Sequence, residues 1–299
     1  MSDMPVLRQS TNHIMMMEPA LFHANPETKA TNSYQHDDDL DVKKIHEKAV
    51  QEFRSFRDLL VMHGLVITTA KGRQESPDDI FCNNWVSTHQ NRLMVLYPML
   101  ASNRQIERRP ELIDLLKKSY SDFQDYSAYE SQDQFLESTG ALCMDRVNKI
   151  AYHARSRRAD DDLSRLWCQK NGYELFSFDT DYKGKPVYHT DVVMWIGSHV
   201  AGICIECLKD RSVIDRLQGK HDVIEFSNEQ MENFCGNSLQ VVGPGGENML
   251  VMSAAGYKTL TASQKSQLDE YYKTIITPEI PTIEYYGGGS ARCMLLELF

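Results

Sequence analysis

Apolar side chains recur along the chain with the spacing of helices in some segments and of strands in others. Between Asp41 and Gly64 they return every three or four residues, which is typical of an amphipathic helix. Asp41 is placed to cap the start of this helix and Gly64 to end it. Residues 65–69 follow at once and are rich in β-branched side chains, which favours a strand. The pattern therefore predicts a helix that leads directly into a strand.

The same succession of strands and helices returns along the rest of the chain. Strands are predicted at residues 92–97, 141–145, 149–153, 174–178, 192–196, 200–205, 222–226, 238–242, 249–253 and 294–298. Helices are predicted at residues 110–120, 161–170, 211–217, 228–234 and 263–272. No long proline- or serine-rich linker interrupts these units of a strand pair and a helix. We therefore expect one α/β domain over residues 1–299, with residues 1–12 as a flexible N-terminal extension.

Composition and charge exclude several classes of protein. The 299 residues are 41% hydrophobic and 25% charged, which is the balance of a folded globular protein. The formal net charge of -10 disfavours nonspecific binding to nucleic acid or to anionic membranes. The chain shows neither a signal-peptide pattern nor the roughly 18 consecutive apolar residues of a membrane span. We expect a cytoplasmic protein with neither nucleic acid nor membrane as a partner.

The seven cysteines are irregularly spaced, which is unlike the disulfide framework of a secreted domain. Cys204 and Cys207 form a CxxC pair that could be half of a zinc site. No second CxxC or HxxxH completes a tetrahedral set of ligands. Because the pair lies in the apolar segment 200–208, we interpret it as two packed thiols. No metal is expected.

Two segments near apolar strands carry reactive side chains. Gly287 to Gly289 free the backbone before Cys293, whose thiol pKa could be lowered by the neighbouring Arg292. His189 and Asp191 are two residues apart, so on an extended chain they share one face and could serve acid–base catalysis or substrate capture. A structural cysteine and a structural histidine are the alternative interpretations.

Two further segments are unusually polar for their surroundings. Glu137 lies between an aromatic–aliphatic pair and a turn of small residues, where it could orient a histidine or accept hydrogen bonds from a guanidinium. The alternative is a solvated loop carboxylate. Residues 76–89 place two aspartates and two asparagines around Phe81 and Trp85, which indicates a pocket rim or, alternatively, a polar turn.

Taken in chain order, six segments resemble the guanidino-group-modifying superfamily, the five-bladed β/α propeller (pentein) enzymes. The resemblance is greatest to citrulline-utilisation hydrolases and amidinotransferase-like proteins. The segments are Asn25-Pro-Glu-Thr28, Pro77-Asp-Asp-Ile-Phe-Cys-Asn-Asn-Trp-Val-Ser-Thr-His89, Glu137-Ser-Thr-Gly140, Tyr188-His-Thr-Asp191, Phe234-Cys-Gly-Asn237 and Gly289-Ser-Ala-Arg-Cys-Met294. Each segment alone is a weak signal, whereas six in order cover nearly the whole chain.

The resemblance implies a cysteine-dependent hydrolase that cleaves a C–N bond of an arginine- or citrulline-type amino acid. Cys293 would be the nucleophile, His189 the general acid–base and Glu137 its acidic partner, with no metal or organic cofactor. The residues expected to contact the substrate are Asn84, Asp191, Asn83, Asp79 and Asn237. Candidates for the substrate's α-amino and α-carboxyl groups are Arg146, Asn237 and Arg292. Amidino transfer and a non-catalytic binding propeller are the alternative functions.

One position departs from the arginine deiminases, in which aspartates occupy the places of Asn84 and Asp191. A carboxylate only accepts hydrogen bonds, whereas the Asn84 amide both donates and accepts. Asn84 could therefore donate to the carbonyl oxygen of a neutral ureido group. This favours citrulline or an uncharged relative as the substrate without excluding arginine derivatives.

Overall fold

The strands of residues 7–299, the part of the chain that this computed structural model describes, form five sheets of three strands each. Written from the inner to the outer strand, the sheets are β15 (Leu296–Glu297), β1 (His13–Glu18) and β2 (Val66–Lys71); β3 (Val86–Thr88), β4 (Leu93–Leu96) and β5 (Asp122–Asp125); β6 (Leu142–Asp145), β7 (Ile150–Ala154) and β8 (Glu174–Phe178); β9 (Met194–Ile196), β10 (Val200–Cys204) and β11 (Asp222–Phe226); and β12 (Leu239–Val242), β13 (Asn248–Val251) and β14 (Ile275–Ile276).

All five sheets share one topology. The middle strand pairs antiparallel with the inner strand and parallel with the outer strand. Parallel neighbours need a crossover connection, usually a helix. The helices that supply it are α1 (Val42–Met62), α3 (Pro110–Lys117), α5 (Asp161–Asn171), α7 (Ser212–Gln218) and α10 (Ala262–Tyr271). The predicted α/β class and its recurring unit of a strand pair and a helix are confirmed.

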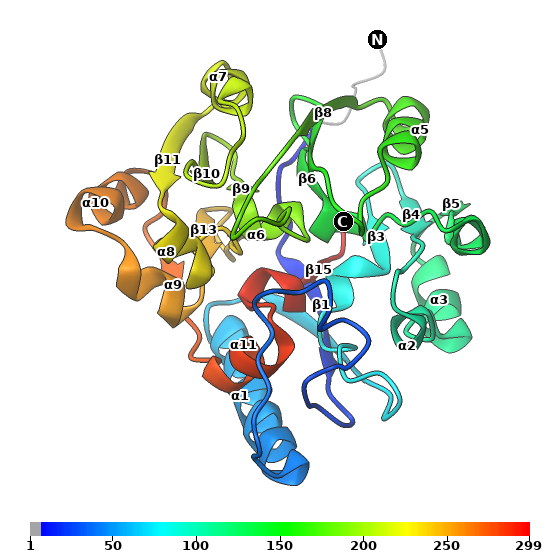
Figure 1. The fold of residues 1–299 in the computed structure, drawn as a ribbon. Helices are drawn as coiled ribbons and strands as arrows, with labels where there is room; N and C mark the ends of the chain where they lie inside the picture. Colours follow the sequence, from blue (N-terminus) through cyan, green and yellow to red (C-terminus); the bar gives the residue numbers. More distant parts are fainter. Residues whose placement is uncertain (1–6) are drawn as a thin grey trace.

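The sheets follow one another in chain order around a common centre, and their helices lie outside (Figure 1). Inner strands of neighbouring sheets contact each other, as β15 does with β3 and β9 does with β6 and β12. In the first sheet Ile14 of β1 lies opposite Glu297 of β15, so the first and last strands of the described chain are partners. The centre is thus formed by segments that are distant in the sequence.

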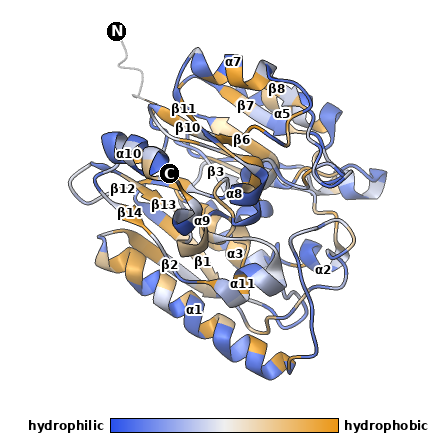
Figure 2. Cartoon of the chain, turned by 60° about the vertical axis from the view of Figure 1, so that its left-hand side comes forward, coloured by the Kyte–Doolittle hydropathy of each residue, from blue (hydrophilic) through white to orange (hydrophobic). Residues whose placement is uncertain are grey.

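Helix α1 forms where its apolar spacing predicts it. Five of its apolar side chains are buried against the core, and alternating apolar and polar bands are visible along it in Figure 2. The Asp41 carboxylate accepts hydrogen bonds from the backbone N–H groups of Lys43 (2.9 Å) and Lys44 (3.3 Å), as a helix cap does. Gly64 follows in the left-handed region at φ +83°, where glycine is favoured.

Two predicted strands are shorter in the structure because a helical turn precedes each of them. Residues 190–193 form helix α6 (Thr190–Val193), and only Met194–Ile196 remain as β9. A 3₁₀ turn, η3 (Ala291–Met294), likewise precedes β15. The remaining helical elements are η1 (Cys82–Asn84), α2 (Ser102–Gln105), η2 (Ser127–Gln132), α4 (Ser138–Ala141), α8 (Asn228–Glu232), α9 (Ala254–Thr259) and α11 (Pro281–Gly287). No helix within residues 7–299 is long and apolar enough to cross a bilayer.

The sequence predicts a flexible extension over residues 1–12, but the second half of this segment is packed against the fold. Residues 1–6 lie outside the described part of the chain, but Gln9 and Ser10 are buried. The Gln9 amide donates to the carbonyl oxygens of Met144 (2.8 Å) and Ile196 (3.3 Å). Its oxygen accepts from the backbone N–H of Arg146 (2.8 Å), so this segment is packed between two inner strands.

Gly202 of β10 provides a test of the packing within a sheet. A Cβ atom at this position would lie 2.3 Å from Nε1 of Trp195 and 2.7 Å from Cζ of Phe226. We expect Gly202→Ala to lower the free energy of unfolding by about 1–3 kcal/mol, because two large rings must shift. Urea denaturation measures the free energy of unfolding. Gly219→Ala is the control, because the atom nearest to the added Cβ would be 3.6 Å away. Equal stability of the two variants would contradict the described packing.

Candidate active site

Five of the six polar segments singled out in the sequence lie before an inner strand, and the sixth, residues 25–28, follows β1. Asn83 and Asn84 in η1 precede β3, Glu137 precedes α4 and β6, and His189 precedes α6 and β9. Asn237 precedes β12, and Cys293 in η3 precedes β15. Because the inner strands surround the centre, each of the five repeated units delivers its polar side chains to the same place.

The Cys293 thiol is buried and is held by an amide. Its Sγ accepts a hydrogen bond from Nδ2 of Asn237 (3.1 Å), and its backbone N–H donates to Oδ1 of the same side chain (3.3 Å). Nδ2 of Asn237 also donates to the carbonyl oxygen of Asp191 (3.0 Å), which fixes the amide. Sγ lies 3.6 Å from Oδ2 of Asp191. Asn237 therefore orients the thiol and does not line the cavity in front of it.

His189 and Glu137 form a buried pair. Nε2 of His189 lies 2.7 Å from Oε2 of Glu137, and Nδ1 lies 3.9 Å from Oδ1 of Asp191. Burial would raise the pKa of Glu137, but the positive charge of Arg158 and the hydrogen bond from His189 outweigh it, so the pKa is held well below its usual value. An ionised Glu137 accepts a hydrogen bond from the Nε2–H group of His189, which leaves Nδ1 as the free ring nitrogen.

Asp191 carries a carboxylate oxygen that the fold leaves free. Its Oδ2 accepts a hydrogen bond from Nδ2 of Asn83 (3.1 Å), which also contacts the Thr139 hydroxyl (3.3 Å). Oδ1 has no hydrogen-bond partner among the described residues, and neither does Oδ1 of Asn83. Buried polar atoms are nearly always satisfied in folded proteins. Two free acceptors at one place therefore indicate a ligand that donates hydrogen bonds.

Arg104 fixes the orientation of the Asn84 amide. NH1 of Arg104 donates to Oδ1 of Asn84 (2.9 Å), and the guanidinium is itself fixed by Glu107 (2.7 Å) and by the carbonyl oxygen of Phe81 (3.0 Å). Arginine can only donate, so the Asn84 oxygen must face it. Nδ2 of Asn84 has no partner among the described residues.

Gly140 separates the free amide nitrogen from His189. A Cβ atom on Gly140 would lie 2.4 Å from Nδ2 of Asn84 and 2.8 Å from Nδ1 of His189. Any side chain at this position would therefore displace both groups, which explains the small residue between Glu137 and β6.

A narrow cavity in front of Cys293 is lined by some of these groups and by residues that the sequence did not reveal. Asp191 and Asn83 are not among its lining residues, although Asp191 lies 3.6 Å from the Cys293 sulfur. His189, Asn84 and Cys293 line it together with Asn32, Asp78, Phe81, Arg104, Arg158, Tyr188, Gly287 and Gly289. Arg104 and Arg158 come from segments with no strong sequence pattern, and an arginine is usually a surface residue. Here both are buried, at 2% and 3% exposed.

The structure does not bring Asp79 to this cavity. Oδ2 of Asp79 accepts from the backbone N–H of Arg73 (2.7 Å), away from Cys293. Its neighbour Asp78 lines the cavity instead, with Oδ2 bonded to Asn25 (2.8 Å) and Thr28 (3.0 Å) and Oδ1 without a partner among the described residues. The sequence indicates two adjacent aspartates, and only the backbone turn decides which of them faces inward.

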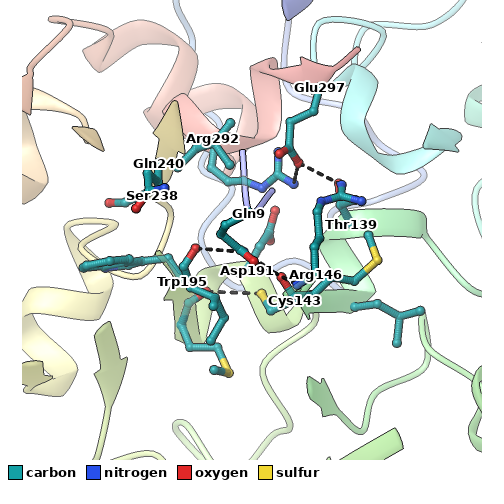
Figure 3. Close-up of a pocket in the computed structure, with 15 residues that line it drawn as sticks. Gln9, Thr139, Cys143, Arg146, Asp191, Trp195, Ser238, Gln240, Arg292 and Glu297 are labelled. Carbon is teal, nitrogen blue, oxygen red and sulfur yellow. Dashed lines mark hydrogen bonds and ion pairs between the residues drawn. The ribbon is translucent and has the colours of Figure 1, made fainter. Parts of the chain in front are cut away.

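Arg146 and Arg292 lie in a separate small cavity that is also lined by Asp191 (Figure 3). Both guanidinium groups contact Oε2 of Glu297, at 3.2 Å and 3.4 Å. NH1 of Arg292 donates to the carbonyl oxygen of Leu295 (2.8 Å). These arginines neutralise a buried carboxylate and do not line the cavity of Cys293.

The cysteine pair at 204 and 207 lies apart from this site. Both thiols are buried, and Sγ of Cys207 lies 3.6 Å from the carbonyl oxygen of Cys204. Within residues 7–299 no group of three or more histidine, cysteine or acidic side chains is arranged to hold a metal ion.

Comparison with solved structures shows that the fold is shared with enzymes that act on arginine derivatives. The N-terminal domain of ArgZ, an arginine dihydrolase from cyanobacteria, matches with a TM-score of 0.75 at 16% identity, over 95% of this chain and 97% of that one. A dimethylarginine dimethylaminohydrolase (DDAH) from Pseudomonas aeruginosa, complexed with citrulline, matches with a TM-score of 0.71 at 17% identity, over 97% and 100%. AgrE in complex with L-arginine matches with a TM-score of 0.76 at 15% identity, over 96% of this chain and 40% of that one.

Comparison with curated protein sequences finds no match. The sequence model of the family described as N,N dimethylarginine dimethylhydrolase, eukaryotic, matches residues 18–299, which include all the polar segments that surround Cys293. The chain therefore belongs to this N,N dimethylarginine dimethylhydrolase family, among the pentein-type guanidino-modifying enzymes.

Proposed function

We propose that this chain is a cysteine-dependent hydrolase that cleaves a C–N bond of a guanidino or ureido group in an arginine- or citrulline-type amino acid. The observation that carries the proposal is the meeting of the Cys293 thiol, the His189–Glu137 pair and the free oxygen of Asp191 in one buried place. The family is described by the hydrolysis of a methylated arginine, and the similar structures include an arginine dihydrolase and a citrulline complex.

The proposed architecture is a single catalytic domain built as a five-bladed β/α propeller. The five sheets of identical topology, arranged in chain order around a centre, support five blades. The candidate site residues come from all five of them, so each blade is required for one site.

In the proposed reaction, the Cys293 thiol gives its proton to His189 as Sγ attacks the central carbon of the planar group, and His189 passes that proton to the departing nitrogen. The C–N bond breaks, an amine or ammonia leaves, and a covalent thiouronium or S-carbamoyl adduct remains on Cys293. His189 then takes a proton from water, whose oxygen attacks the same carbon and displaces the thiol. Because Glu137 occupies Nε2, Nδ1 of His189 is the atom that carries these protons.

Residues with opposite charges line the cavity and suit the two ends of an α-amino acid. Oδ1 of Asp78 is a free acceptor for an ammonium group. The guanidinium of Arg158 lies 4.9 Å from the centre of the Tyr188 ring and contacts Thr31 (2.8 Å). We assign the α-amino group to Asp78 and the α-carboxylate to Arg158, in place of Arg146 and Arg292.

The orientation of Asn84 favours a ureido group. Its free Nδ2 can donate to a carbonyl oxygen, whereas a guanidinium carries only N–H donors. The free oxygen of Asp191 offers an acceptor for the N–H groups that both kinds of substrate carry. One donor and one acceptor therefore match the oxygen and the nitrogen of citrulline.

Release of ammonia from citrulline, arginine and succinylarginine, with an amine assay for dimethylarginine, tests the proposed function. We expect activity on at least one of these compounds, and none above background with Cys293→Ala. His189→Ala should lower kcat by about 10²–10⁴-fold, the usual contribution of a general acid–base. Inactivity of the folded wild-type protein on all four compounds would refute the proposal.

The rate at which iodoacetamide alkylates Cys293 tests the electrostatic role of Asp191. Burial raises the pKa of the Cys293 thiol, and the charge of Asp191 raises it further. Asp191→Asn removes that charge, lowers the thiol pKa and should increase the rate at pH 8 by at least about threefold. Asp162→Asn, an exposed position on α5, is the matched control and Cys293→Ala gives the background. A rate that stays the same or falls in Asp191→Asn would count against this role.

Asn84→Asp tests the substrate preference. The new carboxylate keeps the contact with Arg104 but loses the donor, so kcat/KM for citrulline should fall relative to that for arginine by about tenfold or more. Parallel kinetics on both substrates measure the ratio, with Asn91→Asp in an exposed turn as control. An unchanged ratio would show that the Asn84 amide does not discriminate between citrulline and arginine.

A further inference from the structure

The largest of the cavities described in the structure lies outside the site of Cys293. It has a volume of about 440 Å³. Its lining comes from the loop before α1, the turn at 182–183, the end of α8 with the two residues that follow it, and the helices α9 and α11. These elements are neighbours in Figure 1. The cavity shares no lining residue with that of Cys293. The residues that line it therefore need their own explanation.

Four aromatic rings line this cavity. Tyr34 packs between Tyr182 and Phe234, with ring centres 5.8 Å and 5.6 Å away, and Tyr285 lies on the opposite helix, α11. The Lys183 ammonium lies 4.7 Å from the centre of the Tyr182 ring, so this wall already accommodates one cation. Aromatic faces attract organic cations, and the attraction grows when water is excluded.

A buried carboxylate also lines the cavity. Glu284 on α11 is only 8% exposed and accepts a hydrogen bond from the Ser290 hydroxyl (2.6 Å). No lysine, arginine or histidine among the described residues forms an ion pair with it. Burial, with a smaller effect of the nearby carboxylates of Glu52 and Glu279, raises the pKa of Glu284 to about 7, although hydrogen bonds from Ser290 and Ser253 oppose the shift.

The other charged groups around the cavity do not neutralise Glu284. The ammonium of Lys183 is paired with Glu232 (2.6 Å). The imidazole of His36 stacks on Tyr285 with ring centres 4.9 Å apart. A carboxylate without a basic partner, inside an aromatic cavity of this size, is complementary to a small molecule that has a positive charge and an apolar stem.

We propose that this cavity is a second binding site, which takes a small organic cation such as a primary ammonium or a guanidinium on a short aliphatic chain. Glu284 pairs with the charge, and Tyr34, Tyr182, Phe234 and Tyr285 cover the stem. The site stands independently of the reaction at Cys293. Its occupant would lie one hydrogen bond from the glycine-rich turn, because Ser290 joins Glu284 to the backbone N–H of Cys293.

Binding of n-butylammonium, followed by ligand-observed NMR on the full chain at pH 8.5, tests the proposal. This probe has no guanidino or ureido group, and n-butanol is its uncharged counterpart. We expect millimolar binding of n-butylammonium, and binding of n-butanol at least tenfold weaker. At pH 5.5 the carboxyl of Glu284 is protonated, so the affinity for the cation should fall at least tenfold.

Matched variants locate the probe. Glu284→Gln keeps an acceptor for Ser290 and should weaken binding at least tenfold, whereas Glu279→Gln should change it less than twofold. Tyr285→Ala should weaken binding at least threefold. Because Tyr285 is exposed, its replacement should leave the hydrophobic core unchanged. Cys293→Ala should bind as the wild type does, even if no substrate is ever found for the enzyme.

Three results would overturn the proposal. They are equal binding by Glu284→Gln and the wild type, equal binding of n-butanol and n-butylammonium, and displacement of the probe by citrulline in direct competition. The last result would locate the probe in the cavity of Cys293. Absence of millimolar binding to the folded wild-type protein would also reject the site.

Discussion

The buried carboxylate of Glu137 is the charge around which the centre of this protein is organised. Removing an ion from water costs several kcal/mol unless partners compensate for the lost hydration. The compensation comes from the backbone N–H of Leu100 (3.1 Å), from Arg158 (3.5 Å) and from His189 (2.7 Å). These groups belong to three different sheet units, so the same contacts that stabilise the charge also fix the units relative to one another.

Elements with a long periodic pattern can be predicted from the sequence, whereas short elements without such a pattern are missed. Helix α1 and both of its ends are predicted correctly, because five apolar positions repeat along it. Strands β5 and β14 have four and two residues, too few for any alternation to be visible. The apolar run at 192–196 does not distinguish a strand from a helical turn, and the structure uses both there.

The candidate site could be predicted only in part, for a similar reason. Cys293, His189 and Glu137 stand out because polar residues interrupt small or apolar segments. Arg104 pairs with Glu107 three residues away, but its inward position also depends on Asn84 and Phe81, 20 and 23 residues earlier. Arg158 pairs with Glu137, 21 residues earlier, and no local pattern reports these distant contacts. The inward turn of Asp78 rather than Asp79 depends on hydrogen bonds to Asn25 and Thr28, about 50 residues earlier.

The pairing of β1 with β15 determines when the site can exist. Cys293 immediately precedes β15, whose only sheet partner among the described strands is β1 at the other end of the fold. Closing so long a stretch of chain is slow, because the loop entropy is lost before the contact is gained. During synthesis on the ribosome, Cys293 emerges after the strands of the other four sheet units. The other four sheet units can therefore form first, and the nucleophile joins a scaffold that is already assembled. A nascent chain that has not yet reached Cys293 is a scaffold without chemistry.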